Sequence, residues 1–350
     1  MTGGWVLGVD SGGSGLRTAL ARADAATPPA ADAPRTTGAP PAVGRTSSPE
    51  PVRTSASGID AGHLLEQLLP AARSLLADAG GGHVDAACVG AAGMATLGEE
   101  LREKLPSALA DALGVRRLAL AADAVTGYAG ALGERPGAVV AAGTGMIVVG
   151  TDLRSWRRAD GWGHLLGDCG GGAWIGRAGL EAAMRAHDGR EGGSTALRER
   201  AERMFGPLTG LPGQLYPRTD RPAVLAAFAP EVIRCAGGES EGSPDPVAAG
   251  IVRRAAAEIA MCAAAACPAT DSAPAPAAPA ARPEVALTGG LFRSGAVLLE
   301  PVREELAVRL PHARAAETAG DPLDGALLIA SRLSTDSLRL PPDPSLLTVS

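Results

Sequence analysis

The chain has 350 residues, of which 46% are hydrophobic and 20% charged, and this composition predicts a packed globular protein of two domains. Its formal net charge of −6 argues against a nucleic acid or an anionic membrane as the partner, because both attract basic surfaces. No apolar stretch reaches membrane-spanning length without glycine, proline or charge, and the N-terminus lacks the basic start and apolar region of a signal peptide.

The first 121 residues alternate between short apolar runs and helical patterns. Asp60 is the expected N-cap of the first helix, and Gly80 is its expected stop. The alanine- and proline-rich stretch 25–41 is expected to be a solvated loop. The predicted strands are 6–9, 18–21, 43–46, 86–90 and 118–121, and the predicted helices are 59–78 and 99–113.

The second half repeats a theme of the first, a hairpin with a glycine-rich turn, and this repetition indicates internal duplication. We expect an α/β protein with domains 1–121 and 122–323, and a closing helix at 324–334 that packs back on the first domain. The remaining predicted elements are strands 138–142 and 146–151, a mostly helical stretch 176–266, an alanine/proline loop 270–283, strand 285–288, helix 294–309 and a tail after 334 without a clear period.

The first glycine-rich segment follows strand 6–9 and reads Asp10-Ser11-Gly12-Gly13-Ser14. Glycines let backbone N–H groups approach phosphate oxygens, and Ser14 would add a hydroxyl donor. Asp10 suits water-mediated Mg²⁺ coordination, because Mg²⁺ binds few carboxylates and keeps its waters. A plain hairpin turn explains the segment as well when it is taken alone.

A second turn, Gly143-Thr144-Gly145, has the same form, and two such turns in equivalent halves would grip one polyphosphate from both sides. Between them, Asp123 stands where a strand ends and a helix begins. Its roles as helix N-cap and as general base for an attacking hydroxyl are compatible, because phosphoryl transfer needs a fixed carboxylate.

The stretch 160–176 holds too many glycines to be an ordinary core element. Asp168 would accept hydrogen bonds from sugar hydroxyls. Trp162 and Trp174 are interpreted as packing residues rather than ligand contacts, and His164 as structural rather than catalytic. Further on, a buried strand ends at Gly289 and Gly290, where a close backbone approach would suit adenine, although a simple strand-to-helix turn is the alternative.

Two common phosphoryl-transfer templates are excluded by composition. Lys104 is the only lysine and lies in an amphipathic helix, so a Walker-type loop is absent, and the chain has no asparagine for a protein-kinase catalytic loop. The five cysteines are odd in number and contain no C-x-x-C pair, which disfavours zinc or a disulfide framework and fits a reducing cytoplasm.

In this order, the five segments resemble the N-acetylglucosamine kinase family, within the BadF/BadG/BcrA/BcrD ATPases and the actin-like sugar kinases. The similarity runs from Gly8 to Leu333, and the stretch 161–168 with 174–176 is its most specific part. The resemblance implies two ribonuclease-H-like domains with a cleft between them, and transfer of the γ-phosphate of ATP, with Mg²⁺, to the 6-hydroxyl of a sugar or amino sugar. It also allows a homodimer.

The same resemblance implies a role for each motif residue. Asp10 to Ser14 with Arg17 would form the first phosphate loop, Gly143 to Gly145 the second, and Gly289 with Gly290 the adenosine motif. Asp123 would be the catalytic base. The residues that would contact the sugar are Gly161, Gly163, Asp168, Glu50 and Arg53.

Several positions depart from the family. Ser11 stands where glycine is usual, and Cys169 and Gly171 replace a glutamate and a serine. The family's sugar-binding asparagine is absent, and its region holds Glu50 and Arg53 instead. N-Acetylglucosamine is the default substrate that the resemblance implies. The changed polar contacts make glucosamine or another hexose an alternative, and Glu50 favours glucosamine because a carboxylate suits a free amine better than an acetamide.

Two other readings stay open. The first is a non-catalytic sugar-sensing regulator on the kinase scaffold, which the altered Cys169-Gly170-Gly171 segment allows. The second is a dehydratase-activator ATPase, which resembles this chain in its phosphate loops but holds an iron–sulfur cluster at a dimer interface through cysteines. Cys262 and Cys267 look instead like small core residues of an alanine-rich helix.

Overall fold

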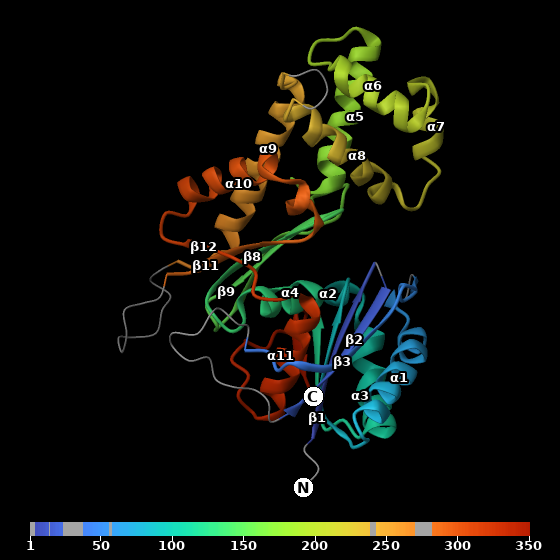
Figure 1. Cartoon of the computed structure of the whole chain (residues 1–350), viewed down its shortest axis with the longest axis vertical. Helices are drawn as coiled ribbons and strands as arrows, with labels where there is room; N and C mark the ends of the chain where they lie inside the picture. Colours follow the sequence, from blue (N-terminus) through green and yellow to red (C-terminus); the bar gives the residue numbers. More distant parts are fainter. Residues whose placement is uncertain (1–3, 14, 24–37, 56–57, 239–242, 270–281) are drawn as a thin grey trace.

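The structure is a computed structural model, and it describes residues 4–13, 15–23, 38–55, 58–238, 243–269 and 282–350. Figure 1 shows two lobes, one above the other, each built around a β-sheet with helices beside it. The predicted loop 25–41 and the alanine/proline loop 270–283 lie mostly outside the described residues. No helix in the described part of the chain is long and apolar enough to span a membrane.

The first lobe is centred on a six-stranded sheet of order β13-β7-β6-β1-β2-β3. Strands β1, β6 and β7 run parallel, and β2, β3 and β13 are antiparallel to their neighbours. Its elements are β1 (Trp5–Gly12), β2 (Gly15–Arg22), β3 (Ala42–Ser48), β4 (Thr54–Ser55), β5 (Gly58–Ile59), α1 (Ala61–Asp78), β6 (Val84–Ala91), α2 (Met94–Leu97), α3 (Glu99–Leu113), β7 (Arg117–Ala122), α4 (Asp123–Leu132), α11 (Pro322–Ser334) and β13 (Leu347–Val349).

The second lobe has a five-stranded sheet of order β10-β9-β8-β11-β12, in which β8, β11 and β12 are parallel. Long helices cover this sheet in the upper part of Figure 1. Its elements are β8 (Gly137–Ala142), β9 (Met146–Thr151), β10 (Trp156–Asp160), α5 (Gly172–Asp188), α6 (Thr195–Phe205), α7 (Leu211–Leu215), α8 (Arg221–Ala236), α9 (Pro246–Ala266), β11 (Glu284–Thr288), α10 (Ala296–Arg309) and β12 (Arg314–Ala316), with short 3₁₀ turns at Leu208–Gly210 and Gly290–Ser294.

Each lobe has a hydrophobic core of its own. The first lies under β1, β6 and β7 and includes buried leucines of α1, α3 and α11. The second lies between the second sheet and helices α5, α8 and α9. Helix α11 packs so closely on β1 that a Cβ on Gly8 would meet Leu327 at 2.9 Å.

Helices α4 and α11 carry the chain between the lobes. The chain leaves the first lobe through α4 and returns to it at α11, after β12. The two helices touch backbone to backbone, since a Cβ on Gly325 would lie 1.9 Å from the Thr126 carbonyl oxygen. On the other helix, a Cβ on Gly130 would lie 2.0 Å from the Asp321 carbonyl oxygen.

Most predicted elements are confirmed, and Asp60 caps α1 by accepting the N–H of His63 at 2.9 Å. Strands β4, β5, β10 and β12 and the short helix α2 were not predicted, and Ile59, predicted to start the first helix, lies in β5. The tail, which has no clear period in the sequence, contributes residues 347–349, and these pair with β7 as β13. Helix α5 begins at Gly172, four residues before the predicted helical stretch.

Candidate functional site

Asp10 and Asp123 lie at the same edge of the first sheet. Asp10 pairs in register with Gly90 of the parallel strand β6, and Gly90 pairs with Ala121 of β7, two residues before Asp123. The carboxyl ends of parallel strands form the usual ligand-binding edge of an α/β sheet. The fold therefore brings together two carboxylates that are 113 residues apart.

Asp123 occupies the first turn of α4. It is the first helical residue rather than the cap, which is Ala122, and its Oδ1 accepts the N–H of Ala124 at 2.9 Å. Its side chain is open to solvent, although protein atoms surround it densely. This desolvation, helped by the negative charge of Asp10, raises the pKa of Asp123 above the ordinary aspartate value of 3.8. A raised pKa at an accessible carboxylate is typical of a general base.

Asp10 is held by Arg17, its partner in the β1–β2 register. Arg17 donates to Oδ2 of Asp10 from two nitrogens, at 2.5 and 3.0 Å, and to Asp321 at 2.7 Å. Asp321 is the N-cap of α11 and forms a capping box with Asp324. Arg17 thus ties the first glycine turn to the helix that returns from the second lobe.

The first glycine turn closes the β1–β2 hairpin. A Cβ on Gly12 or Gly13 would meet no atom within 4 Å, so both face open space. Gly15 is different, because its φ of +120° and the Ser48 carbonyl, 2.0 Å from an ideal Cβ, exclude any side chain. Ser11 is buried, and Ser14 lies outside the described residues.

The second glycine turn joins β8 and β9 at the matching edge of the second sheet. Gly143 and Thr144 are exposed, and their carbonyls accept the N–H groups of Gly172 and Ala173 at 2.9 and 2.8 Å. The first turn of α5 therefore holds this turn in place. Such an anchored turn leaves Gly143 and Thr144 exposed.

Gly289 lies beside the start of that second turn. It follows β11, which pairs with β8, and a Cβ on it would lie 2.2 Å from the carbonyl oxygen of Ala142. With a φ of +105°, only glycine fits this position without strain. Gly290 begins a 3₁₀ turn, and both glycines are exposed. The structure thus brings the predicted adenosine motif against the predicted second phosphate loop.

Two aspartates organise the loop after β10. Asp160 accepts the N–H groups of Asp168 at 2.7 Å and of Cys169 at 2.9 Å. Asp168 accepts the N–H of Gly163 at 3.1 Å, and it lies against Gly145, where a Cβ would be 2.4 Å from its Oδ2. Desolvation raises the pKa of Asp168. Asp168 therefore braces this loop against the second glycine turn, a role that its spacing did not reveal.

Trp162 is not a core residue, so its interpretation as packing was wrong. Its side chain is 64% exposed, and the guanidinium of Arg158 stacks on it at 4.4 Å from the ring centroid. Arg158 also donates to the carbonyls of Asp160 and Gly161. Its positive charge is close enough to Asp123 to act against the rise of that carboxyl's pKa. Trp174, as expected, packs against the second core.

Arg158 and Asp160 belong to the site, yet sequence reasoning assigned them no role. Both lie on β10, a strand that was not predicted. Asp160 has a φ of 60°, a conformation in which aspartate is enriched among non-glycine residues. The Asp-Gly-Trp-Gly sequence was the available signal, since it marks a sharp change of direction directly after a strand.

Glu50 and Arg53 lie in the segment after β3, and their side chains are 61% and 68% exposed. They approach each other at 3.9 Å, and Glu50 lies 3.3 Å from Nε2 of the buried His63. The backbone N–H of Arg53 donates to Nδ1 of His63 at 3.1 Å. In the described part of the chain, no hydrogen bond or ion pair links either residue to Asp123 or to the glycine turns.

The residues near Asp10 fit a water-retaining Mg²⁺. Arg17 occupies only Oδ2, which leaves Oδ1 of Asp10 for a metal-bound water. Among the residues described, no three His, Cys, Asp or Glu side chains gather into a metal-binding group. A Mg²⁺ that arrives with a nucleotide does not need such a group, because phosphate oxygens and waters supply most of its ligands.

The sequence model of the BadF/BadG/BcrA/BcrD ATPase family matches residues 7–330. An N-acetylmuramic acid/N-acetylglucosamine kinase of Clostridium acetobutylicum is 39% identical over 69 residues. That match covers 19% of this chain and 22% of the kinase, so the chain aligns with about a fifth of that curated relative.

Solved structures resemble the whole chain. A candidate N-acetylglucosamine kinase of Chromobacterium violaceum is 27% identical, with coverage of 93% of this chain and 98% of that one and a TM-score of 0.61. One of Porphyromonas gingivalis is 15% identical, covers 96% and 100%, and has a TM-score of 0.63. A ROK hexokinase of Thermus thermophilus is 17% identical, covers 93% and 98%, and has a TM-score of 0.52. The fold is therefore α/β with two ribonuclease-H-like domains.

Proposed function

Because the chain belongs to the BadF/BadG/BcrA/BcrD ATPase family, we propose that it is a sugar kinase that transfers the γ-phosphate of ATP to the 6-hydroxyl of an amino sugar. N-Acetylglucosamine is the default acceptor, and glucosamine or another hexose is the alternative. One observation carries the proposal: an accessible Asp123 with a raised pKa lies at the same sheet edge as Asp10. This pairing supplies a base and a metal-side carboxylate together.

In this mechanism each motif does one task. The two glycine turns would offer backbone N–H donors to the phosphates of ATP, except for the Gly143 N–H, which donates to the Gly145 carbonyl within its own turn. Gly289 with Gly290 lies where adenosine would lie beside the second turn. Mg²⁺, when bound, neutralises charge on the phosphates. Asp123 accepts the proton of the attacking hydroxyl, and its position at a helix start keeps it fixed.

Arg17 has a positioning task in this scheme. It holds Asp10 through two donors and is itself anchored on the N-cap of α11 by Asp321. The orientation of the metal-side carboxylate then depends on contact with the returning helix. Arg17, which the resemblance assigns to the first phosphate loop, therefore supports Asp10.

The sugar would lie between Asp123 and the loop after β10, with Asp168, Gly161 and Gly163 around it. One face of the Trp162 ring carries Arg158, which leaves a largely exposed indole at this place. Glu50 and Arg53 would have to reach the sugar from the first lobe. Closure of the lobes would bring these groups together and exclude water, the competing phosphoryl acceptor.

A coupled assay of ADP release tests the proposal. We expect ADP release above the ATP-only rate with at least one member of a panel of N-acetylglucosamine, N-acetylmuramic acid, glucosamine and glucose. Phosphorylation at the 6-hydroxyl is checked by NMR of the product. A protein that binds a sugar of the panel yet releases no ADP is the non-catalytic sensor, and that result rejects the kinase.

The rate should fall on the acid side at a higher pH than an ordinary aspartate would give. Asp123 must be ionised to take a proton, and desolvation together with the charge of Asp10 raises its pKa above 3.8. The profile of kcat/KM for the sugar against pH, measured with saturating ATP, gives the apparent pKa of the enzyme–ATP complex that the sugar meets. An acid limb at or below pH 3.8 contradicts the assignment.

The dehydratase-activator reading has less support from the structure. Cys267 is buried at the C-terminal end of α9, where a cluster shared between two subunits would not reach its sulfur. Burial also raises the pKa of Cys267 to about 11, which disfavours the thiolate that binds iron. Iron analysis of the purified protein distinguishes the two functions.

A further inference from the structure

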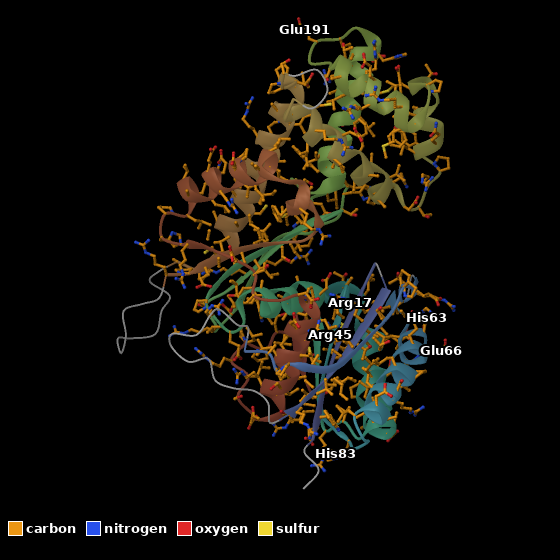
Figure 2. All side chains as sticks on the ribbon, viewed as in Figure 1. Arg17, Arg45, His63, Glu66, His83 and Glu191 are labelled. Atoms are coloured by element: carbon orange, nitrogen blue, oxygen red, sulfur yellow. The ribbon has the colours of Figure 1, made fainter. Side chains whose placement is uncertain are left out.

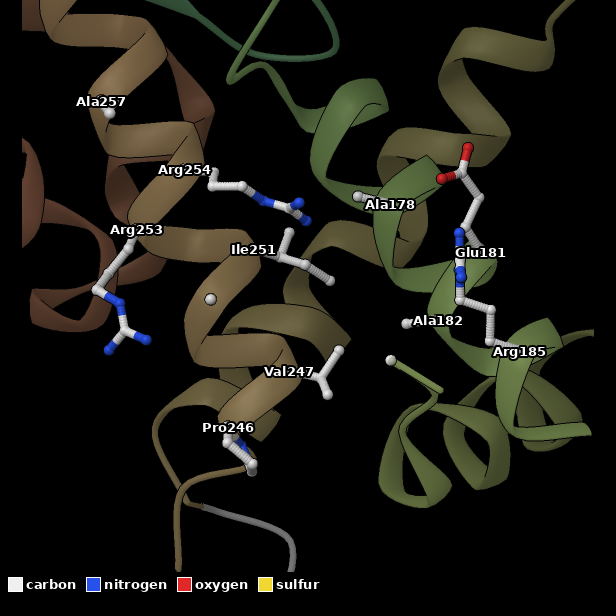
Figure 3. Close-up of a pocket in the computed structure, with 12 residues that line it drawn as sticks. Ala178, Glu181, Ala182, Arg185, Pro246, Val247, Ile251, Arg253, Arg254 and Ala257 are labelled. Carbon is white, nitrogen blue, oxygen red and sulfur yellow. The ribbon is translucent and has the colours of Figure 1, made fainter. Parts of the chain in front are cut away.

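A separate cavity lies in the helical part of the second lobe, between α5 and α9 (Figure 3). Its volume is about 650 Å³, which is within the range of sites that hold small molecules. None of the residues that line it belongs to the candidate site described above. Figure 2 shows that the helices around it stand in the upper lobe, far from the labelled Arg17 and Arg45 of the lower lobe.

The floor of the cavity is apolar. Ile251 and Ala182 are buried, and Val247 is half-buried. In Figure 3, Ile251 and Val247 of α9 point toward α5, across from Ala182. An apolar floor with a few polar groups around it is the common form of a small-molecule site.

The walls of the cavity are basic. The side chains of Arg253 and Arg254 on α9 form no ion pair or hydrogen bond with any described residue. The side chain of Arg185 on α5 donates only to the Glu191 carbonyl, at 3.4 Å. Figure 3 shows the Arg254 guanidinium extended from α9 toward α5. The cavity's single acidic residue in the described part is Glu181, which already faces Arg177 at 3.7 Å. Unpaired arginines in a chain of net charge −6 favour an anionic ligand.

We propose that the α5–α9 cavity binds a small organic phosphate, a phosphate monoester with an apolar group. Arg254 and Arg185 would hold the phosphoryl oxygens, since guanidinium groups match phosphate geometry in a bidentate way. The apolar group would rest on Ile251, Val247 and Ala182. Binding at this cavity does not depend on the kinase reaction, so the two proposals can be tested separately.

Calorimetric titration with phenyl phosphate tests the site, with inorganic phosphate and benzyl alcohol as the anion-only and apolar-only probes. We expect phenyl phosphate to bind about tenfold more tightly than either, because it alone satisfies both the arginines and the floor. Arg254→Ala should weaken phenyl phosphate binding about tenfold or more. Arg303→Ala on α10, an exposed arginine outside the cavity, should leave it unchanged.

A second variant fills the cavity without disturbing the fold. Gly250 lies inside α9 and lines the cavity, and a Cβ on it would meet no atom within 4 Å. Gly250→Leu should abolish phenyl phosphate binding and keep or raise Tm, because leucine is the better helix former. Phenyl phosphate could also occupy the glycine turns, and this variant separates the two places. Unchanged binding in both Gly250→Leu and Arg254→Ala, equal affinity for inorganic phosphate, or no binding at millimolar concentration overturns the proposal.

Discussion

Asp123→Asn is expected to lower kcat about 10²–10⁴-fold, the range attributed to a positioned general base. Asparagine keeps the shape of the side chain but does not accept the proton of the sugar hydroxyl. The glycine turns are untouched, so the affinity for ATP should change little. Steady-state kinetics and a nucleotide titration check both parts. Turnover within tenfold of the parent protein would remove Asp123 from the role of base.

The same variant should not lose stability. The pKa of Asp123 is raised in the folded protein, so folding disfavours its ionised form. As pH rises from the unfolded pKa through the folded one, the unfolded state loses its proton first, and the free energy of unfolding falls. At neutral pH the ionised carboxylate therefore costs stability, and asparagine removes that cost. Thermal unfolding should show Tm of Asp123→Asn equal to or above the parent at pH 7, with the difference vanishing below pH 3.8.

A lower kcat together with an unchanged or higher Tm in Asp123→Asn distinguishes a catalytic role of Asp123 from a structural one. A residue kept only for structure, such as a helix cap, would reduce Tm when replaced. A base whose ionised form is disfavoured in the folded state does the reverse, because its activity depends on a destabilised charge. Lower activity with preserved or higher Tm is thus the signature of the proposed role. Equal losses of both would instead make Asp123 a structural residue.

Local patterns in the sequence were sufficient to predict which strand ends form the candidate site. The strands before Asp10, Asp123 and Gly143 are short apolar runs that end in glycine or aspartate, and such runs are readable from composition alone. Parallel pairing then puts their ends on common edges. For this reason the glycine turns and both carboxylates could be predicted before the structure.

Contacts between distant segments could not be predicted in this way. Arg17 and Asp321 are 304 residues apart, and no periodicity links them. Strand β10 reads Trp-Arg-Arg-Ala-Asp, which lacks the apolar alternation of a half-buried strand, so Arg158 and Asp160 went unassigned. Trp162 was misread because aromatic residues are usually buried, whereas this one stands on a loop beside an arginine.

Helices α4 and α11 link the site to both lobes. They cross so closely that a larger side chain at the crossing should reduce both stability and activity. Asp123 begins α4, and Asp321, the anchor of Arg17, caps α11. The distance between the helices therefore affects how Asp123 lies relative to Asp10, which Arg17 connects to Asp321. Glycines at the contact allow this distance, because larger side chains would keep the two backbones apart.

Gly325→Ala is expected to lower the free energy of unfolding by about 1–3 kcal/mol or more, the cost of overpacking a rigid contact. The new Cβ would lie 1.9 Å from the Thr126 carbonyl oxygen and 2.5 Å from the Gly130 nitrogen, and both are backbone atoms that no rotamer change can move aside. The helices must separate, so kcat should fall as well, since Asp123 lies on the displaced helix. Differential scanning calorimetry and the ADP-release assay measure the two losses.

Gly127→Ala is the matched control, because Gly127 lies on α4, the partner helix of the same crossing, and a Cβ there would meet no atom within 4 Å. That substitution should raise the free energy of unfolding by up to about 1 kcal/mol through helix propensity. If the two glycine-to-alanine substitutions change the free energy of unfolding in opposite directions, the loss in Gly325→Ala comes from the helix crossing. If Gly325→Ala proves as stable and active as Gly127→Ala, the helices do not touch as closely as described, and the coupling of Arg17 to α11 loses its structural basis.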